Sequence, residues 1–440
     1  MNRRQFLRTT AGFTAIMVSP GVFSIFASCN GKKSYPFRSY QEGSASVPVK
    51  IVTPDDGFYI HTFYDVNPFS PGGRLLAVTR LPFQKRRPEF GDKADICIID
   101  LENETIETVY STKGWGFQLG ANLNWGSTDR YIYTNDIIGN EAVCVRIDLK
   151  TKEMKAFSGP KYHLSPDGSH AIGFPLDLIN VTQKGYGVPQ FRELEKISGA
   201  PADEGLWETN QQTDEKRLLV SLKEAADNAS DKGYLEGGNF YFFHSKYNPQ
   251  GTKILQVMRC LFPDNPDKRG WNPMLFVFNS DGSDIHEAVS RLHWGYGGNH
   301  PNWHPDGRHI IMNLRPKWLG EDKMRFCMFH HTGKDFRIID SRHLGSGHPS
   351  VDPKTKYLIS DCYQHEPMAK ENGHVPIRFI HLETGDESEI CSVFTDLDIK
   401  KSTLRVDPHP AWDGNYKRIC FNGAPDGKRQ VFVAEMESVL

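Results

Sequence analysis

The sequence predicts an all-β protein, a seven-bladed β-propeller closed by a strand from its own N-terminal part. Composition is the first of three observations behind this prediction. Of 440 residues, 12% are aromatic, 39 are glycine and 27 are proline, which favours strands and tight turns over long helices. Second, a weak repeat built on a Pro-Asp-Gly-like turn recurs along the chain. Third, a short apolar strand and a further hairpin follow each copy, so one unit supplies four strands.

The repeat defines seven units, and its clearest copy is HPNWHPDG at 300–307. The units begin at residues 66, 122, 161, 244, 300, 348 and 409. Unit three carries a long insertion, expected at 175–235. The last unit stops one strand short, so we expect residues 47–53 (VPVKIVT) to pair with it and close the ring. The whole of 46–440 is then one propeller domain.

The first 29 residues have the layout of an export signal, with a basic start, an apolar stretch and small residues. The segment 3–7, RRQFL, resembles the twin-arginine export signal. The segment 26–29, FASC, resembles a relaxed lipoprotein box, which leaves lipidation of Cys29 and simple cleavage nearby as alternatives. We therefore expect an exported protein, either periplasmic or an outer-membrane-anchored lipoprotein. Residues 30–45 are expected to be a tether, and a lipid at Cys29 would be the only membrane contact.

Charge and cysteine usage exclude several classes of function. The chain has 52 Lys and Arg against 54 Asp and Glu, a net charge of -2, so no nucleic-acid partner is expected. The cysteines after Cys29 lie mostly inside apolar segments and form no CxxC pair. Buried structural thiols are therefore expected, rather than a zinc site made of cysteines or a thiol nucleophile.

One register position of the repeat is histidine in four consecutive units: His244, His300, His348 and His409. The first strand of each propeller blade lines the central channel, so these imidazoles are expected to converge near one mouth. Converging imidazoles bind a divalent metal such as manganese or zinc, with calcium as a third candidate. The alternative is that the His-Pro dipeptides only pack the channel and bind main-chain groups. Units one to three carry Val66, Asn122 and Lys161 there, which leaves room for a ligand.

Three units end their second strand with arginine: Arg80, Arg259 and Arg315. Because that strand runs antiparallel to the first, these ends are expected to return to the face of the histidines. Guanidinium groups there would bind a carboxylate with two hydrogen bonds, whereas the alternative is simple solvation. Other residues expected at this face are His61, Tyr64, Gln118, Lys184, Tyr186, Arg192, Tyr241, Trp271, Trp294 and Tyr296. The aromatic ones would either stack on sugar rings or pack the blades.

Together, the HPxWxPDG units, the register histidines and the insertion that ends in DEGLW at 203–207 resemble the oligogalacturonate lyase family. They also resemble the propeller lyases that cut ulvan or rhamnosyl-glucuronate linkages. The resemblance covers most of the chain after the export signal, and it implies β-elimination on an acidic poly- or oligosaccharide. Two departures concern the site. The glutamine-plus-histidine metal set is not reproduced as such, and the second histidine of the ulvan type falls near Arg80 and Leu81.

The resemblance implies metal ligands among the four register histidines and carboxylate neutralisation by the metal or Arg259. We expect His61 and Tyr186 to act as base and acid. The residues expected to contact substrate are Arg80, Gln118, Lys184, Trp271 and Arg315. Two alternatives remain, a glycosidase acting on rhamnose linked to glucuronate and a non-catalytic module that binds acidic glycans.

Overall fold

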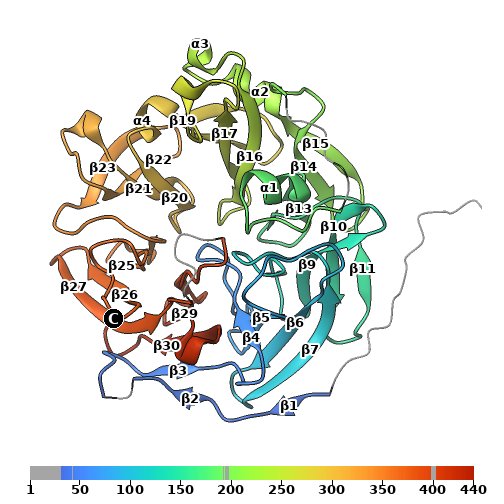
Figure 1. Cartoon of the computed structure of the whole chain (residues 1–440), viewed down its shortest axis with the longest axis vertical. Coiled ribbons are helices and arrows are strands. Elements are labelled where there is room, and N and C mark those ends of the chain that lie inside the picture. The colour runs from blue at the N-terminus through green and yellow to red at the C-terminus, as the bar shows by residue number, and fades with distance from the viewer. Residues whose placement is uncertain (1–30, 42, 192, 194–197, 398–402) are drawn as a thin grey trace, which may run out of the picture.

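The computed structural model describes residues 31–41, 43–191, 193, 198–397 and 403–440. The expected export signal, with Cys29, and Arg192 lie outside the described residues. Seven antiparallel sheets follow one another around a central axis, and chain order runs around the ring (Figure 1). The predicted seven-bladed β-propeller is therefore confirmed.

Each blade is a meander whose first strand lies nearest the axis (Figure 1). Blades 1 to 3 contain β4 (Phe58–Ile60), β5 (Leu75–Leu81), β6 (Ala94–Asp100) and β7 (Thr105–Thr112); β8 (Asn124–Trp125), β9 (Tyr131–Ile138), β10 (Glu141–Asp148) and β11 (Met154–Ala156); and β12 (His163–Leu164), β13 (His170–Gly173), β14 (Gly205–Asn210) and β15 (Lys216–Ser221). Blades 4 and 5 contain β16 (Asn239–Tyr247), β17 (Lys253–Leu261), β18 (Met274–Asn279) and β19 (His286–Val289); and β20 (Gly298–Trp303), β21 (His309–Leu314), β22 (Arg325–His330) and β23 (Lys334–Asp340). Blade 6 contains β24 (Ser350–Val351), β25 (Tyr357–Ser360), β26 (His374–His381) and β27 (Asp386–Phe394).

Blade 7 joins both ends of the described chain. Its strands β28 (Ala411–Trp412), β29 (Arg418–Gly423) and β30 (Gln430–Glu435) are followed by β3 (Val49–Ile51), which pairs with β30. The predicted closure of the ring by an N-terminal strand is confirmed. Closure leaves β30 with a partner on each side, which removes an exposed sheet edge.

Part of the segment expected to be a tether adds to the sheets. Strand β2 (Arg38–Ser39) pairs with β3 on the outside of blade 7, and β1 (Lys33–Ser34) pairs with β7 on the outside of blade 1. Both strands run along the same rim of the ring (Figure 1). Extended backbone pairs readily with an unpaired outer edge, which explains why this short polar stretch lies against the domain.

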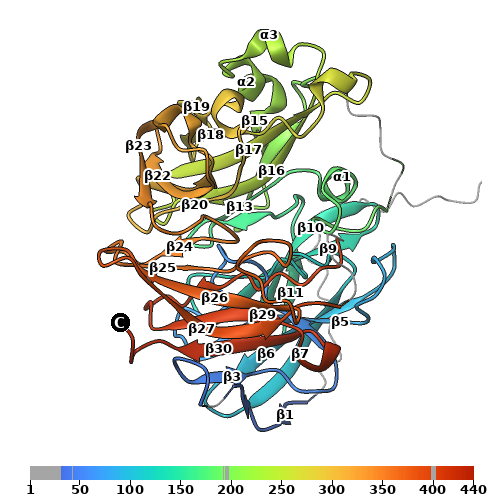
Figure 2. The same ribbon diagram turned by 60° about the vertical axis from the view of Figure 1, so that its left-hand side comes forward.

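The insertion in blade 3 differs from the expected 175–235 range, because β14 and β15 belong to the blade itself. The inserted segment is therefore the one between β13 and β14, which contains α1 (Leu176–Thr182). A second excursion, α2 (Leu222–Asp227) and α3 (Lys232–Leu235), connects blade 3 to blade 4 and lies at the outer rim in both views (Figures 1 and 2). A capping box of Ser221 and Glu224 starts α2, which explains why the chain leaves the strand there.

The remaining helical elements are α4 (Arg291–Trp294) and three short 3-10 turns, η1 (Pro266–Lys268), η2 (Lys317–Leu319) and η3 (Pro425–Gly427). Among the described residues, no helix is both long and apolar enough to cross a membrane. The seven described cysteines are buried and free of disulfides, as expected.

Candidate functional site

The backbone takes a left-handed conformation at, or directly before, each of the four register histidines. His244, His300 and His409 have left-handed backbone conformations, with φ of 58°, 57° and 52°. His348 follows Gly347, which has φ of 60°. The ladders of blades 4 and 5 shift register at His244 and His300. A left-handed conformation costs an L-residue about 1–2 kcal/mol, and such strain concentrates at functional sites.

The structure brings the four histidines together around one phenylalanine. The rings of His300 and His348 have centroids 3.9 Å apart, and those of His348 and His409 are 4.3 Å apart. Phe63 lies between them and His244, with its ring 4.5 Å from His409 and stacked on His244 at 5.5 Å.

Phe63 reaches this place because the inner strand of blade 1 is interrupted. Ile60 pairs with Thr79, whereas the next bridge of that strand joins Phe69 to Leu76. The inner strand therefore has more residues between these two pairings than the neighbouring strand β5 has. The extra residues, which include Phe63, leave the sheet and enter the channel. Val66, the expected register residue of blade 1, lines a pocket at the other end of the channel. Sequence reasoning did not single out Phe63.

His348, Asp407 and His409 form a buried group that could hold a metal ion. One potential ligand atom from each residue lies within 4.8 Å of the others, and within the described part of the chain no other set of His, Cys, Asp and Glu meets this criterion. Two of the four histidines expected as ligands, His348 and His409, belong to this group, and Asp407 joins them. Nitrogen and carboxylate oxygen donors suit manganese and zinc.

Hydrogen bonds prepare the ring of His348 for this role. Its Nδ1 lies 2.8 Å from Asp361 Oδ1, so it donates its proton there and leaves Nε2 with a lone pair. Nε2 of His348 and both ring nitrogens of His409 are buried and lack hydrogen-bond partners in the described chain. Unpaired buried polar atoms are costly, and a cation would satisfy them. The donor set therefore fits a metal.

The other two register histidines are held differently. His300 Nδ1 lies 2.6 Å from the Gly347 carbonyl oxygen, which can only accept, so Nε2 carries the lone pair. That Nε2 faces the Tyr363 hydroxyl at 3.4 Å. His244 Nδ1 lies 2.5 Å from the Tyr162 hydroxyl. Burial lowers the pKa of both histidines well below the ordinary value, which favours neutral imidazoles.

A cleft of about 460 Å³ opens beside the group. Asp407 belongs to both the group and the cleft wall, so the two adjoin at this residue. The wall includes Trp271, a residue that is 56% exposed, and Arg405, whose Nε lies 2.8 Å from Asp407 Oδ2. Tyr363 adds a hydroxyl, and burial raises its pKa well above the ordinary value, which keeps it protonated.

Arg259 lies between two aromatic rings, one of which, that of Trp271, lines this cleft. Its guanidinium carbon is 4.5 Å from the centroid of Phe243 and 4.4 Å from that of Trp271. Its Nε and Nη1 are buried without hydrogen-bond partners among the described residues, and burial lowers its pKa. Unlike Arg405, which is paired with Asp407, Arg259 therefore keeps two donors for an anion.

The expected base and acid are both buried. His61 is 0% exposed, and its ring lies 6.5 Å from that of His409, with Nε2 3.4 Å from the Pro408 carbonyl oxygen. Burial lowers the pKa of His61 to about 4. Tyr186 is 8% exposed, and its ring lies 6.1 Å from that of His244. Because His61 is fully buried, its ring offers no exposed surface to a substrate.

The other expected substrate contacts lie elsewhere than on the cleft wall. Gln118 is buried, and its amide donates to the carbonyl oxygens of Thr403 and Arg405, so it holds the segment that carries Arg405. Arg80 donates to the Asp56 carbonyl oxygen. Lys184 and Arg315 are exposed, and neither lines the cleft. Among the residues expected to contact substrate, Trp271 alone lines the cleft.

Sequence reasoning missed three residues of the site: Tyr363, Arg405 and Asp407. Asp407 carried a usable signal, since it lies two positions before His409, and such a short spacing can supply two ligands. Tyr363 and Arg405 carried none, because both lie outside the repeat turn and reach the cleft only through the packing of blades 6 and 7.

The fold and the site together define a seven-bladed β-propeller with a buried group that could hold a cation and a cleft beside it. No family model and no curated protein matches the chain. Among solved structures it is similar to an oligogalacturonate lyase in complex with manganese, with a TM-score of 0.65, 15% identity, and coverage of 93% of this chain and 98% of that one. It is also similar to the oligogalacturonate lyase of Vibrio parahaemolyticus, with a TM-score of 0.65, 14% identity, and coverage of 93% and 99%. At this identity the likeness establishes the fold.

Proposed function

We propose that the protein is a polysaccharide lyase that cleaves uronic-acid-containing glycans by β-elimination, with a divalent cation held by His348, Asp407 and His409. The buried group of these three residues, one of which also lines a cleft, is the observation that carries the proposal. The likeness to an oligogalacturonate lyase structure with manganese supports it. Manganese or zinc suits the donors better than calcium, which prefers an all-oxygen site.

Neutralisation of the uronate carboxylate is the first requirement of this chemistry. When bound, a divalent cation would withdraw charge from the carboxylate and so acidify the proton on the neighbouring ring carbon. Arg259 can donate a hydrogen bond to the same carboxylate, because its Nε and Nη1 have no hydrogen-bond partner among the described residues. Trp271 presents an exposed ring against which the sugar can stack.

Proton transfer is assigned to His300 and Tyr363. His300 lies outside the group of three, and its bond to the Gly347 carbonyl leaves the Nε2 lone pair free to remove the proton. The Tyr363 hydroxyl, protonated and 3.4 Å from that nitrogen, delivers a proton to the leaving glycosidic oxygen. The carbon–hydrogen and carbon–oxygen bonds break, and a carbon–carbon double bond forms in the product. His61 and Tyr186 then act as positioning residues behind His409 and beside His244.

The proposal also includes the location of this activity. The layout of residues 1–29 suits export, so the substrate would be an acidic poly- or oligosaccharide outside the cytoplasm. Lipidation of Cys29 would retain the domain at a membrane surface without altering the site.

The test uses the chain from residue 30 onward, stripped with chelator and assayed on a panel of uronate polysaccharides and oligosaccharides, with and without added manganese or zinc. We expect a chelator-sensitive rise in ultraviolet absorbance from the unsaturated product. His409→Ala should abolish this rise, whereas His330→Ala, which removes a histidine remote from the cleft, should preserve it. Release of rhamnose with a flat absorbance trace would overturn the proposal in favour of a glycosidase, and binding without any product would favour a binding module.

A further inference from the structure

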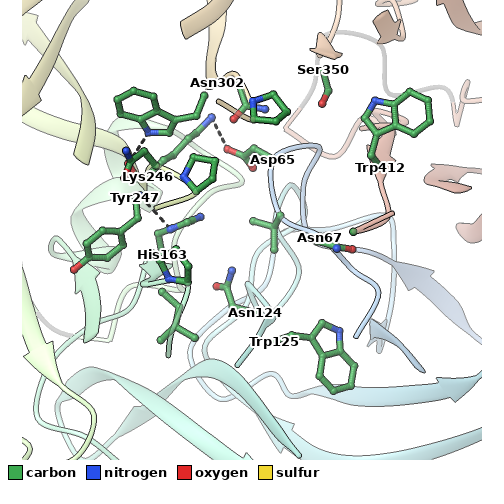
Figure 3. Close-up of a pocket in the computed structure, with 18 of the residues that line it drawn as sticks. Asp65, Asn67, Asn124, Trp125, His163, Lys246, Tyr247, Asn302, Ser350 and Trp412 are labelled. Carbon is green, nitrogen blue, oxygen red and sulfur yellow. Dashed lines mark hydrogen bonds and ion pairs between the residues drawn. The ribbon is translucent and has the colours of Figure 1, made fainter. Parts of the chain in front are cut away.

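The channel has a second pocket at the mouth opposite the histidines, which we name the distal pocket. Its volume is about 590 Å³, within the range of about 300–1,000 Å³ typical of small-molecule sites. Its wall residues follow the register histidines along the same inner strands: Lys246 comes two positions after His244, and Asn302 two after His300. Because a strand advances about 3.3 Å per residue, the pocket lies farther along the channel than the histidines. Figure 3 shows side chains from all seven blades around its centre.

A layer of buried residues lies between the distal pocket and the histidines. The ring of Tyr64 is 5.6 Å from that of His300, and its hydroxyl lies 3.2 Å from Lys246 Nζ on the pocket side. Lys246 forms an ion pair with Asp65 and donates to the Pro301 carbonyl oxygen at 2.6 Å. A ligand in the distal pocket is thus separate from the proposed cation site.

The charged groups of the distal pocket are already paired. Asp65 and Lys246 neutralise each other, and Asp413 is paired with Arg418 at 3.2 Å. His163 accepts the Tyr247 amide N–H at Nδ1, and burial lowers its pKa to about 4, which leaves the ring uncharged at neutral pH. The wall therefore favours an uncharged ligand over the acidic sugar expected in the cleft.

Aromatic rings form much of the remaining wall, and most of their polar atoms are engaged. Trp125 Nε1 donates to the Pro68 carbonyl oxygen at 2.8 Å, and Trp303 Nε1 donates to that of Lys246 at 3.0 Å. Trp412 differs, since its Nε1 is buried without a partner in the described part of the chain. The whole residue is only 6% exposed, and Figure 3 shows its indole nitrogen turned toward the pocket side. An unpaired buried donor of this kind indicates a missing acceptor.

Amide and hydroxyl groups supply further hydrogen bonds around the same space. Asn302 and Ser350 line the pocket, and their side chains make no hydrogen bond with a described residue. Asn124 Oδ1 accepts a hydrogen bond from Lys161 Nζ, so the amide nitrogen of Asn124 remains available as a donor. Apolar ring faces beside several separate donors and acceptors match a sugar ring, which has an apolar face and hydroxyls that both donate and accept.

We propose that the distal pocket is a binding site for an uncharged sugar residue, separate from the cleft beside His348, Asp407 and His409. The sugar stacks on the tryptophan rings, accepts the Trp412 N–H through a hydroxyl or ring oxygen, and is oriented by Asn302. This site does not depend on the proposed lyase activity, because no residue of the cleft contributes to it.

The probes are methyl glycosides of neutral sugars (rhamnose, xylose, glucose and galactose), with methyl glucuronide as the charged comparison. Saturation-transfer NMR and tryptophan fluorescence measure binding to the metal-free chain, so that the cleft lacks its cation. We expect saturable binding of at least one neutral glycoside and weaker binding of the glucuronide. Trp412→Phe keeps a ring but removes the N–H, and a neutral hydrogen bond is worth about 0.5–1.5 kcal/mol, so affinity should fall roughly two- to twelvefold.

Asn302→Ala changes a half-buried side chain and should also weaken binding, which keeps the test valid if Trp412→Phe fails to fold. Trp271→Ala, in the cleft, is the matched control and should leave neutral-sugar binding unchanged. The proposal is wrong if no neutral glycoside binds saturably. It is also wrong if Trp271→Ala abolishes binding while Trp412→Phe and Asn302→Ala retain it, or if the glucuronide binds as tightly as the neutral sugars.

Discussion

Asp361 orients two residues of the proposed cation site, and Asp361→Asn tests how much that orientation contributes. The carboxylate is 1% exposed. Asp361 Oδ1 lies 2.8 Å from both the backbone nitrogen and the Nδ1 atom of His348, and it accepts a hydrogen bond from each. Asp361 Oδ2 accepts a hydrogen bond from the His409 backbone N–H at 3.0 Å. Asparagine keeps one acceptor oxygen and places an NH2 group at the other position, so at least one N–H must face another donor.

The expected loss follows from the number of contacts broken. A carboxylate that holds a metal-ligating histidine typically contributes 10–100-fold to metal affinity, so Asp361→Asn should weaken manganese binding by roughly that factor. One buried N–H left unsatisfied should also lower the free energy of unfolding by about 1–3 kcal/mol. Isothermal titration calorimetry with manganese measures the affinity, and denaturant unfolding of the metal-free protein measures the stability.

A matched control separates the two effects. Asp340→Asn removes another buried carboxylate with a histidine partner, since Asp340 Oδ2 lies 2.8 Å from His343 Nδ1 at the end of β23. It should cost similar stability and leave manganese affinity unchanged. Unchanged affinity in Asp361→Asn, or an equal loss in both variants, would refute the reasoning that Asp361 acts through the ligands.

Three further predictions concern single side chains. His300→Asn should retain manganese affinity within about threefold but lower kcat on the uronate substrate by roughly 10²–10⁴-fold; loss of metal binding in calorimetry would instead make His300 a ligand. Arg259→Lys keeps the positive charge but removes the planar guanidinium, so kcat/KM from steady-state kinetics should fall at least about tenfold. An unchanged kcat/KM would exclude carboxylate binding by Arg259. Burial lowers the pKa of Lys161 from 10.5 to about 7 in the folded protein. Between pH 7 and 10.5 the unfolded chain therefore holds one more proton than the folded chain, so the free energy of unfolding should rise with pH across this range. Lys161→Met should reduce this slope in denaturant titrations at pH 7 to 10, and an unchanged slope would show that Lys161 is not its source.

The blade architecture could be predicted because its signals are local. Pro-Asp-Gly-like turns, apolar strands and Gly, Asn or Asp hairpins each act over a few residues, and they repeat once per blade. The missing last strand also predicted closure by residues 47–53, since an unpaired edge at β30 needs a partner. The insertion was located less well, because β14 and β15 lack the repeat turn and resembled inserted sequence.

The site was predicted in part. Register alone placed His348 and His409 near one another, because the same position in neighbouring blades faces the same axis. Register did not separate the ligands from His244 and His300, whose Nδ1 atoms bond to the Tyr162 hydroxyl and the Gly347 carbonyl oxygen. Those bonds join residues from different blades.

By itself, the sequence determined an all-β propeller of seven blades, closed by its N-terminal part, with histidines along one side of the channel. These features depend on turn chemistry and strand periodicity, which act locally and repeat. Only the tertiary structure decided that Asp407 joins His348 and His409, that His61 is buried behind them, and that a second pocket occupies the opposite mouth. These outcomes depend on distances between blades and on the bulge of blade 1 that places Phe63 in the channel, which neither composition nor spacing specifies.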